Sequence, residues 1–377
     1  MQEFFSTLNK SDAFLLLNGL SKIGPVTGKR LLDQFNGNPL AVFQASDREL
    51  LAVQGIGQSV LSSIRDQKNA AWLKKEKENL KARQISFVSE LQIPSLLREI
   101  YDCPLGLYVC GKIPEGPYLS IVGTRAPSLY GQRICRELSC NLAKRGFCIV
   151  SGMARGIDAI AHRGAIEANG KTIAFLGSGM DVIYPPEHLD LYRKISQSGA
   201  VLSEFPFGRK ADRRTFPMRN RLVSGISNGV IVVESAASGG SLITANFAAE
   251  QGRLVFALPG RVDQESSAGC LELIRNGATL IRSAQDVEEE LQPVIPNAQS
   301  SFAFKDESVK LEKRKIEVSM SCQEIKIFEV LKEGAILSAD EICGLSGLGL
   351  PMVAASLTML ELNGFISKRA DAKYEII

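Results

Sequence analysis

The sequence predicts an α/β protein built on a doubly wound, mostly parallel sheet, with a small helical domain before it and a winged-helix domain after it. Three observations carry this prediction. Short β-branched runs alternate with helical stretches through the middle of the chain, glycine turns separate short helices near the N-terminus, and the last sixty residues have three helical segments and a β-like tail. Alternating strands and helices are typical of parallel sheets with helices on both faces.

Residues 1–75 read as short helices punctuated by glycine. Segments 20–35 and 50–64 share one plan, in which an apolar helix end, a Gly-Pro or Gly-x-Gly turn and an amphipathic helix follow one another. This weak repeat is similar to a helix-hairpin-helix, whose tight turn lets backbone N–H groups approach phosphate. Two ordinary helical hairpins explain it equally well, because "GIGQS" lacks a basic residue. We expect a charged connector helix over 76–100, at the start of a core that extends to 291.

Several strands of the core are predicted to be buried on both faces, because their apolar runs are continuous and do not alternate with polar residues. Ligands of such sheets bind at the carboxyl ends of the strands. Small and polar residues, among them Gly123, Ser151 and Glu234, gather at these ends. The predicted strands are 118–123, 147–152, 172–177, 200–204, 229–235, 254–260 and 278–282.

Residues 292–318 lose periodicity and gain proline, serine and charge, which predicts a linker. Residues 319–377 then place a capped short helix, a glycine-rich turn and a proline-initiated helix in the order of a winged helix-turn-helix. The second of these helices, 351–364, contains no Arg or Lys. A helix without these side chains is poorly suited to reading bases or phosphates, so we expect this domain to contact protein.

Composition excludes several classes of protein. The net charge is only +3, so any nucleic-acid binding must come from a local basic patch. No apolar run approaches the ~18 residues of a membrane span, and the first twenty residues lack the basic start of a signal peptide. We therefore expect a cytoplasmic protein. The eight cysteines never form CxxC and there are only two histidines, so we expect reduced core thiols, no metal site and no cofactor.

Two strand ends carry arginine beside glycine. Arg125 follows the strand over 118–123, where a neighbouring glycine leaves room for an oxyanion. In "SGMARGIDAIAH", residues 151–162, Ser151, Gly152, Arg155 and Gly156 stand between a strand and a helix. Amides and a helix dipole in this arrangement stabilise phosphate. Asp158 and His162 share a helix face, and we interpret His162 as a packing residue that pairs with Asp158.

The densest basic stretch lies further along the chain. "FGRKADRR" (207–214) precedes "FPMRNRLVSGIS" (216–227), in which Arg219 and Arg221 flank Asn220. Basic side chains interleaved with aromatic ones are typical of grooves for single-stranded nucleic acid. Another Gly/Ser turn opens a helix after the strand over 229–235, and Ser238, Gly239 and Ser241 are its expected phosphate donors.

The sequence offers no convincing catalytic group. Glu204 and Glu234 end separate strands and could converge for acid–base chemistry. No nucleophile elbow accompanies them. We therefore expect a protein that holds phosphate without breaking bonds.

These motifs together resemble the DNA-processing protein A (DprA/Smf) family of bacteria. The resemblance runs from about 118 to 282 through "YLSIVGTRAPSLYGQ", "VSGMARGIDAIAHRGAI", "TIAFLGSGMDVIYPPEH", "FPMRNRLVSGIS" and "VVESAASGGSLITANFAAEQGRLVFALPG". It implies a Rossmann-like core that binds and protects incoming single-stranded DNA, helps to load the RecA recombinase onto it in natural transformation, and forms a homodimer. It also implies that the N-terminal domain is of the SAM or helix-hairpin-helix type.

By position, the resemblance assigns Arg125 to contact with single-stranded DNA and residues of the glycine-rich turn, including Asp158, to a pocket. It assigns Arg219, Asn220 and Arg221 to an R-N-R element and Ser238, Gly239 and Ser241 to an S-G-x-S turn. One departure is Pro186, which stands where several members have Lys or Arg. Arg209 or Lys210 are the candidates to supply that charge.

Two other functions compete with DNA binding. A nucleoside-phosphate enzyme of the Lonely Guy (LOG) phosphoribohydrolase type would bind its substrate at the same sheet edge, but its P-G-G-x-G-T-x-x-E motif is absent from 259–269. A winged-helix transcription factor would account only for the C-terminal domain.

Overall fold

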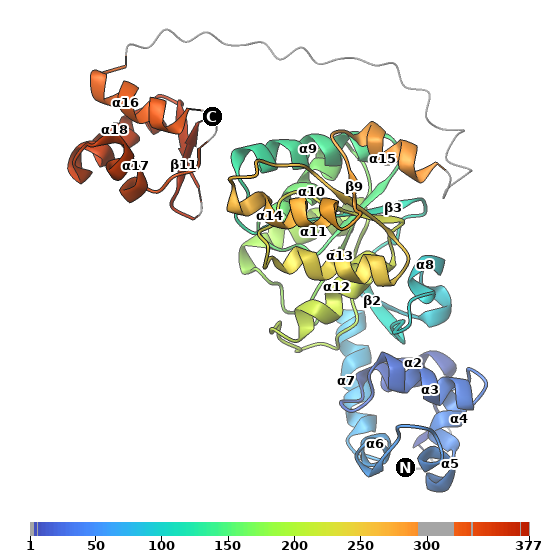
Figure 1. The fold of residues 1–377 in the computed structure, drawn as a ribbon. Coiled ribbons are helices and arrows are strands. Elements are labelled where there is room, and N and C mark those ends of the chain that lie inside the picture. The colour runs from blue at the N-terminus through green and yellow to red at the C-terminus, as the bar shows by residue number, and fades with distance from the viewer. Residues whose placement is uncertain (1–3, 6, 293–319, 333–334, 370, 377) are drawn as a thin grey trace.

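The computed structural model describes residues 4–292 except residue 6, and residues 320–376 except 333–334 and 370 (Figure 1). A central sheet with helices on both of its faces forms the middle of the molecule. The predicted linker 292–318 lies, apart from residue 292, outside the described residues.

The sheet has nine strands in the order β1-β2-β6-β5-β4-β3-β7-β8-β9. All seven predicted strands are present, and they run parallel to one another from β6 to β9. The predicted doubly wound, mostly parallel sheet is therefore confirmed. These seven strands are β3 (Tyr118–Val122), β4 (Cys148–Ser151), β5 (Thr172–Phe175), β6 (Ala200–Ser203), β7 (Gly229–Val232), β8 (Leu254–Ala257) and β9 (Thr279–Leu280).

Two antiparallel strands at one edge were not predicted. β1 (Ser86–Ser89) pairs with β2 (Gly106–Gly111), which pairs with β6. The prediction of one connector helix over 76–100 is therefore wrong. Helix α7 (Asn69–Ala82) ends before β1, and only the short η1 (Glu90–Gln92) and α8 (Ser95–Arg98) follow within that range.

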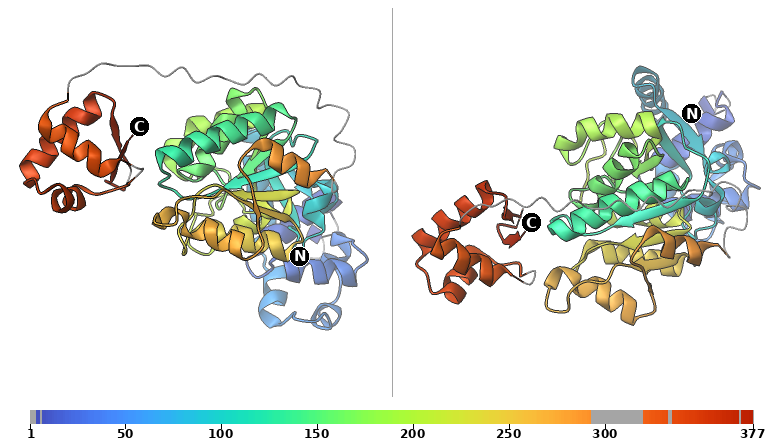
Figure 2. Two further views of the ribbon diagram at one scale, coloured as in Figure 1. Left: turned by 45° about the horizontal axis from the view of Figure 1, so that its top comes forward. Right: turned by 90° about the horizontal axis from the view of Figure 1, so that it is seen from above.

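Alternate residues of the central strands point to opposite faces, so both faces of the sheet are apolar and covered (Figure 2). On one face Leu119 and Ile121 pack against α9 and α10, beside α11 and α15. On the other face Val122 and Val230 pack against α12 and α13, beside α8 and α14. The bounds are α9 (Leu129–Lys144), α10 (Ile157–Glu167), α11 (Leu189–Ser198), α12 (Thr215–Gly225), α13 (Gly240–Glu250), α14 (Ala268–Arg275) and α15 (Ala284–Leu291), with single turns η2 (Pro186–His188) and η3 (Glu265–Ser267).

The N-terminal helices pack onto the sheet itself. Their apolar side chains form one cluster with Tyr108 of β2 and Val201 of β6. Glycines precede α3 and α6 without a side-chain cap, as the repeat predicts. The helices are α2 (Lys10–Gly19), α3 (Pro25–Gln34), α4 (Pro39–Gln44), α5 (Asp47–Leu51), α6 (Gln58–Ile64) and α7.

The C-terminal segment has a hydrophobic core of its own, which includes Ile342, Val353 and Leu357. It consists of α16 (Cys322–Leu331), α17 (Ala339–Ser346), α18 (Leu350–Leu362), β10 (Ile366–Lys368) and β11 (Tyr374–Ile376). Among the described residues no single helix is long and apolar enough to cross a membrane. The pair α17 and α18, bent by 111°, reaches that length and composition only when the two helices are taken together.

Candidate nucleic-acid interface

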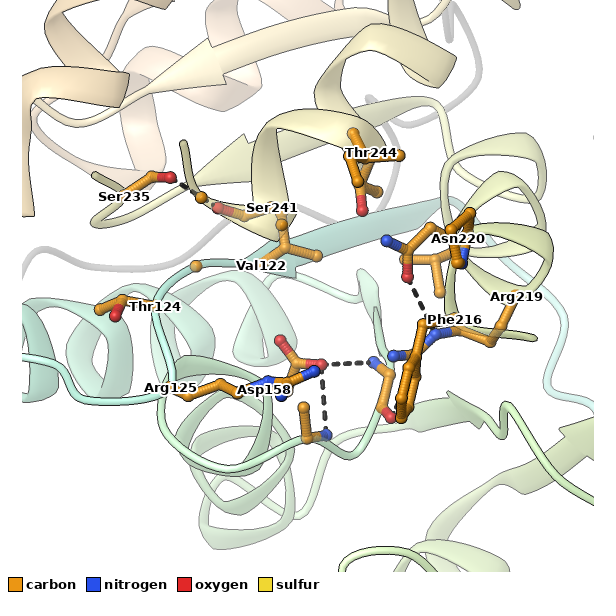
Figure 3. Close-up of a pocket in the computed structure, with 18 of the residues that line it drawn as sticks. Val122, Thr124, Arg125, Asp158, Phe216, Arg219, Asn220, Ser235, Ser241 and Thr244 are labelled. Carbon is orange, nitrogen blue, oxygen red and sulfur yellow. Dashed lines mark hydrogen bonds between the residues drawn. The ribbon is translucent and has the colours of Figure 1, made fainter. Parts of the chain in front are cut away.

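A cavity of about 550 Å³ opens between the carboxyl ends of β3 and β7. These neighbouring strands continue into α9 and α13, which lie on opposite faces of the sheet, so the cavity occupies the switch point where ligands of such folds bind. We call it the switch-point cavity (Figure 3). Of the predicted site residues, seven line it: Arg125, Gly152, Asp158, Arg219, Asn220, Gly239 and Ser241.

Arg125 lies where the sequence predicts, directly after β3. The backbone is fixed there by the N–H of Thr124, which donates to the carbonyl of Glu234 at 2.7 Å. The Arg125 side chain is exposed, and its guanidinium carbon lies 5.4 Å from the ring centroid of Phe216. Among the described residues it forms no ion pair. Its charge is therefore available to an anion, and its flat face is already supported by an aromatic ring.

The glycine-rich turn between β4 and α10 is organised by Asp158. One oxygen of this carboxylate accepts from the N–H groups of Gly152 and Ala154, each at 3.2 Å. Burial raises the pKa of Asp158, against the opposing effect of Arg219. The prediction that these amides bind phosphate is thus wrong for Gly152, because its N–H already serves an internal carboxylate. Ser151 is buried too, and its hydroxyl donates to the carbonyl of Ile121 at 2.7 Å.

Gly156 has a structural reason to be glycine. It has a φ of +73°, and a Cβ atom at this position would collide with the carbonyl oxygen of Thr124. The turn therefore approaches the Arg125 loop through a contact that only glycine permits. Arg155, next to it, lies outside the switch-point cavity. Its Nε donates to Glu187 at 2.5 Å, beside a small recess that it shares with Arg125 and Tyr184.

His162 does not pair with Asp158 as predicted. Its Nδ1 lies 2.7 Å from the hydroxyl of Thr172, which itself donates to the carbonyl of Ile149. Nδ1 is therefore the protonated nitrogen, and the buried Nε2 has no partner among the described residues. Burial lowers the pKa of His162 to about 3, with the positive charge of Arg219 acting in the same direction.

We expect acid to destabilise the protein through His162. In the unfolded chain this ring binds a proton below about pH 6.5, but the folded protein keeps it neutral, so stability present above that pH is lost as the pH falls. When the pH falls from 6 to 5, the free energy of unfolding of the parent protein should decrease by about 1.4 kcal/mol more than that of His162→Gln. Urea denaturation at several pH values measures this, and equal slopes in both proteins would contradict it.

Arg219 and Arg221 lie on α12, and the structure separates their roles. The Arg219 guanidinium is buried and donates to the carbonyl oxygens of Gly152 and Phe175, at the ends of β4 and β5. Its Nε donates to the side-chain oxygen of Asn220 at 3.0 Å (Figure 3). The amide nitrogen of Asn220 takes no part in this hydrogen bond. Arg219 therefore forms part of the cavity wall.

Arg221 is not in the switch-point cavity, so the predicted pair of phosphate-binding guanidiniums is wrong. Its Nη2 donates to both carboxylate oxygens of Glu204 at 2.6 Å, and its Nε lies 3.1 Å from Asp102. The Arg221 side chain is only 4% exposed. Residues two apart on a helix point in nearly opposite directions, so Arg219 and Arg221 cannot face one strand of nucleic acid.

The N-terminus of α13 forms the opposite wall. Gly239 is its N-cap residue and provides no side-chain cap, so the first N–H groups of an eleven-residue helix face the cavity region. The hydroxyl of Ser241 donates to that of Ser235 at 2.8 Å. Ser238 is exposed beside this turn but does not line the cavity.

Several lining residues were not among the predicted site residues, including Arg213, Phe216 and Thr244. The basic and aromatic stretch had indicated the first two, but the choice among its members depends on the course of the chain. Arg213 is exposed at the cavity, whereas Arg209 pairs with Asp212 at 2.6 Å and Lys210 does not line the cavity. Arg213 is thus the basic side chain from residues 207–214 that reaches the cavity.

The two candidate acid–base carboxylates do not converge. Glu204 follows β6 and Glu234 follows β7, and three strands separate these two in the sheet. Glu204 is bound to Arg221, while Glu234 accepts from the N–H of Ser128 at 2.9 Å and from the hydroxyl of Ser266. Both are structural acceptors. Among the described residues, no group of three or more His, Cys, Asp or Glu side chains could hold a metal ion.

The fold and the cavity define a class: a doubly wound α/β protein with an anion-suited, arginine-bearing site at its switch point. Residues 84–292, more than half of the chain, match the family model described as DNA recombination-mediator protein A. The chain belongs to this family, which includes the DNA-processing proteins named DprA and Smf. The resemblance drawn from the motifs is therefore confirmed.

Relatives match over much of their lengths. Protein Smf of Synechocystis is 34% identical over 381 residues, covering 94% of this chain and 95% of that protein. DNA processing protein DprA of Bacillus subtilis is 43% identical over 207 residues, covering 54% and 70%. The X-ray structure of DprA from Streptococcus pneumoniae has a TM-score of 0.62 at 31% identity, covering 75% and 98%. DNA processing protein A of Helicobacter pylori, studied for its unique mode of binding single-stranded DNA, has a TM-score of 0.51 at 32% identity, covering 56% and 97%.

Proposed function

We propose that this protein binds single-stranded DNA across the switch-point cavity, protects it, and passes it to the RecA recombinase during transformation. The observation that carries the proposal is the exposed guanidinium of Arg125, unpaired among the described residues, which lies over Phe216 at the mouth of the cavity. A cation and an aromatic face side by side suit a phosphate and an unstacked base. The Helicobacter pylori relative, whose single-stranded DNA binding has been studied, supports the same ligand.

The supporting residues differ in what they can contribute. Arg213 and Arg125 offer charge, and the uncapped start of α13 offers backbone N–H groups. Asn220 and Thr244 offer neutral polar atoms within the cavity. Asp158, Ser151, Gly156 and Arg221 act by shaping the site, because their polar groups or backbones are committed to internal contacts. The protein acts as a binding protein, with no carboxylate pair placed for catalysis among the described residues.

The flanking segments belong to the same proposal. We infer that α16–α18 with β10 and β11 form a winged helix that contacts protein, since α18 carries no Arg or Lys. Residues 1–75 form a domain of the SAM or helix-hairpin-helix type. The protein acts in the cytoplasm as a homodimer, as the family resemblance implies.

The binding of single-stranded DNA should depend on salt in a defined way. Each phosphate neutralised on a single strand contributes roughly −0.7 to the slope of log K against log salt concentration. Arg125 and Arg213 together predict a slope of about −1.4 or steeper. Fluorescence anisotropy with a labelled oligothymidine at several salt concentrations measures the slope.

The same titration distinguishes the competing function. Duplex DNA and free nucleoside monophosphates serve as competitors. Poor competition by both supports a single-strand site. Displacement of the oligonucleotide by micromolar nucleotide, together with a flat salt response, would favour a nucleoside-phosphate enzyme instead.

A further inference from the structure

One face of α7 carries a buried acid. Glu76 is only 3% exposed, although Lys75 and Lys77 on either side of it are exposed. A carboxylate taken out of water is costly unless hydrogen bonds compensate for the lost hydration. Its partners therefore show what the position is used for.

Both partners of Glu76 lie outside the N-terminal helices. Its Oε1 accepts from the hydroxyl of Tyr108 on β2 at 2.7 Å and from the backbone N–H of Phe207 at 3.0 Å. Phe207 follows β6 and opens the segment 207–214, which we call the basic loop. The carboxylate thus ties α7, strand β2 and the start of the basic loop together.

The Phe207 ring packs against Tyr108 and Arg83. It lies edge-on to Tyr108, with ring centroids 5.4 Å apart, and the guanidinium carbon of Arg83 lies 5.8 Å from its centroid. The next residue, Gly208, donates its N–H to Asp181 at 2.8 Å. The first two residues of the basic loop are therefore anchored.

The far end of the basic loop is anchored to α12. Asp212 accepts from the N–H groups of Arg214 and Thr215, at 2.8 and 3.0 Å. Arg213 lies just before this end and reaches the switch-point cavity. With both ends held, few conformations of the segment remain, so the position of Arg213 depends on where the loop begins.

We propose that Glu76 is a positioning residue for DNA binding: it fixes the start of the basic loop and thereby holds Arg213 at the switch-point cavity. The inference rests on the proposed function only for the role of Arg213. It gives the N-terminal helices a part in DNA binding that needs no contact between them and DNA.

Amide hydrogen exchange without DNA tests the positioning itself. Glu76→Ala in the full chain is expected to raise exchange across 207–214 by about tenfold or more, because the loop loses a charge-assisted anchor. Glu76→Gln, which keeps the acceptor oxygen, should restore most of the protection. Glu78→Ala, an exposed acid on the same helix, is the matched control. Unchanged exchange in Glu76→Ala would overturn the proposal.

A double-mutant comparison tests the link to DNA. Glu76→Ala should weaken oligothymidine binding about three- to tenfold in the parent protein, and should have no further effect in Arg213→Ala. Equal weakening in both backgrounds would show a general effect on the fold and overturn the proposal. If Arg213→Ala binds DNA like the parent, the proposed role of Arg213 fails, whereas the exchange experiment still decides whether Glu76 anchors the loop.

If Glu76→Ala does not fold, Glu76→Asp provides a second test of the anchoring. Glu76→Asp keeps the charge but shortens the side chain by one methylene, which draws the acceptor away from the Phe207 N–H. Exchange across 207–214 should then rise while the rest of the chain keeps its protection. An unchanged basic loop in this variant would also contradict the proposal.

Discussion

Replacing Arg125 with alanine is expected to weaken the binding of single-stranded DNA about 10- to 100-fold and to leave the melting temperature unchanged. Hydrogen bonds to charged groups contribute about 1.5–3 kcal/mol, and each 1.4 kcal/mol corresponds to a factor of ten. The Arg125 side chain is exposed and forms no ion pair among the described residues, so the folded protein loses little with it. Anisotropy titration and thermal denaturation measure the two quantities.

Four further variants sharpen this result. Arg193→Ala removes another exposed positive charge, from α11, which does not line the cavity, and should bind DNA almost as the parent does. Arg125→Lys keeps the charge but loses the flat contact with Phe216, so its affinity should be intermediate. Arg155→Ala should have a smaller effect than Arg125→Ala, because Glu187 already pairs with that guanidinium. Parent-like affinity in the Arg125→Ala, Arg155→Ala double variant would refute the interface.

Replacing Arg221 with alanine is expected to lower the free energy of unfolding by about 3–5 kcal/mol. The substitution leaves the carboxylate of Glu204, whose side chain is only 8% exposed, without the Nη2 group that donates to both of its oxygens. Burial already raises the pKa of Glu204 against the opposing effect of Arg221. Removing the arginine should raise that pKa further, so the loss should be larger at pH 8 than at pH 5. Urea denaturation at the two pH values measures it.

The control for Arg221 is Arg214→Ala, an exposed arginine at the start of the same helix, which should change stability by no more than about 0.5 kcal/mol. Joint replacement of Arg221 and Glu204 by Met should recover much of the loss, because no charge is then left buried. If Arg221→Ala is stable but fails to bind DNA, Arg221 contacts DNA and its assignment as a structural residue is wrong.

The parallel strands could be predicted because each is a short, continuously apolar run with small residues after it. β3 and β7 are examples, and every residue in both is buried. β1 was missed because an edge strand is only partly buried, as the exposure along β1 shows. That reason does not extend to β2, which lies inside the sheet and is mostly buried. The inward orientation of Glu76 was missed for a related reason: among the charges of "KKEKENLKAR" nothing marks one acid as buried.

The candidate site was predicted by position and only partly by role. Arg125 and Gly239 line the cavity as expected, because a residue that follows a parallel strand or opens the next helix is placed by the topology. Asn220 lines it too, from the middle of α12. Arg221 and Asp158 were assigned to the ligand, yet both bind internal partners. A charged residue near a site reads the same in sequence whether it faces the ligand or a buried group of opposite charge.

The sequence by itself determined the sheet, its helices and the edge at which a ligand binds, because hydrophobic runs and glycine turns act locally and along the chain. Only the tertiary structure decided which arginines are free. Arg125 stays exposed, Arg219 binds two strand-end carbonyls, and Arg221 binds Glu204, a residue seventeen positions away. These choices depend on distances between separate elements, and such distances exist only once the sheet has formed and the helices have packed on it.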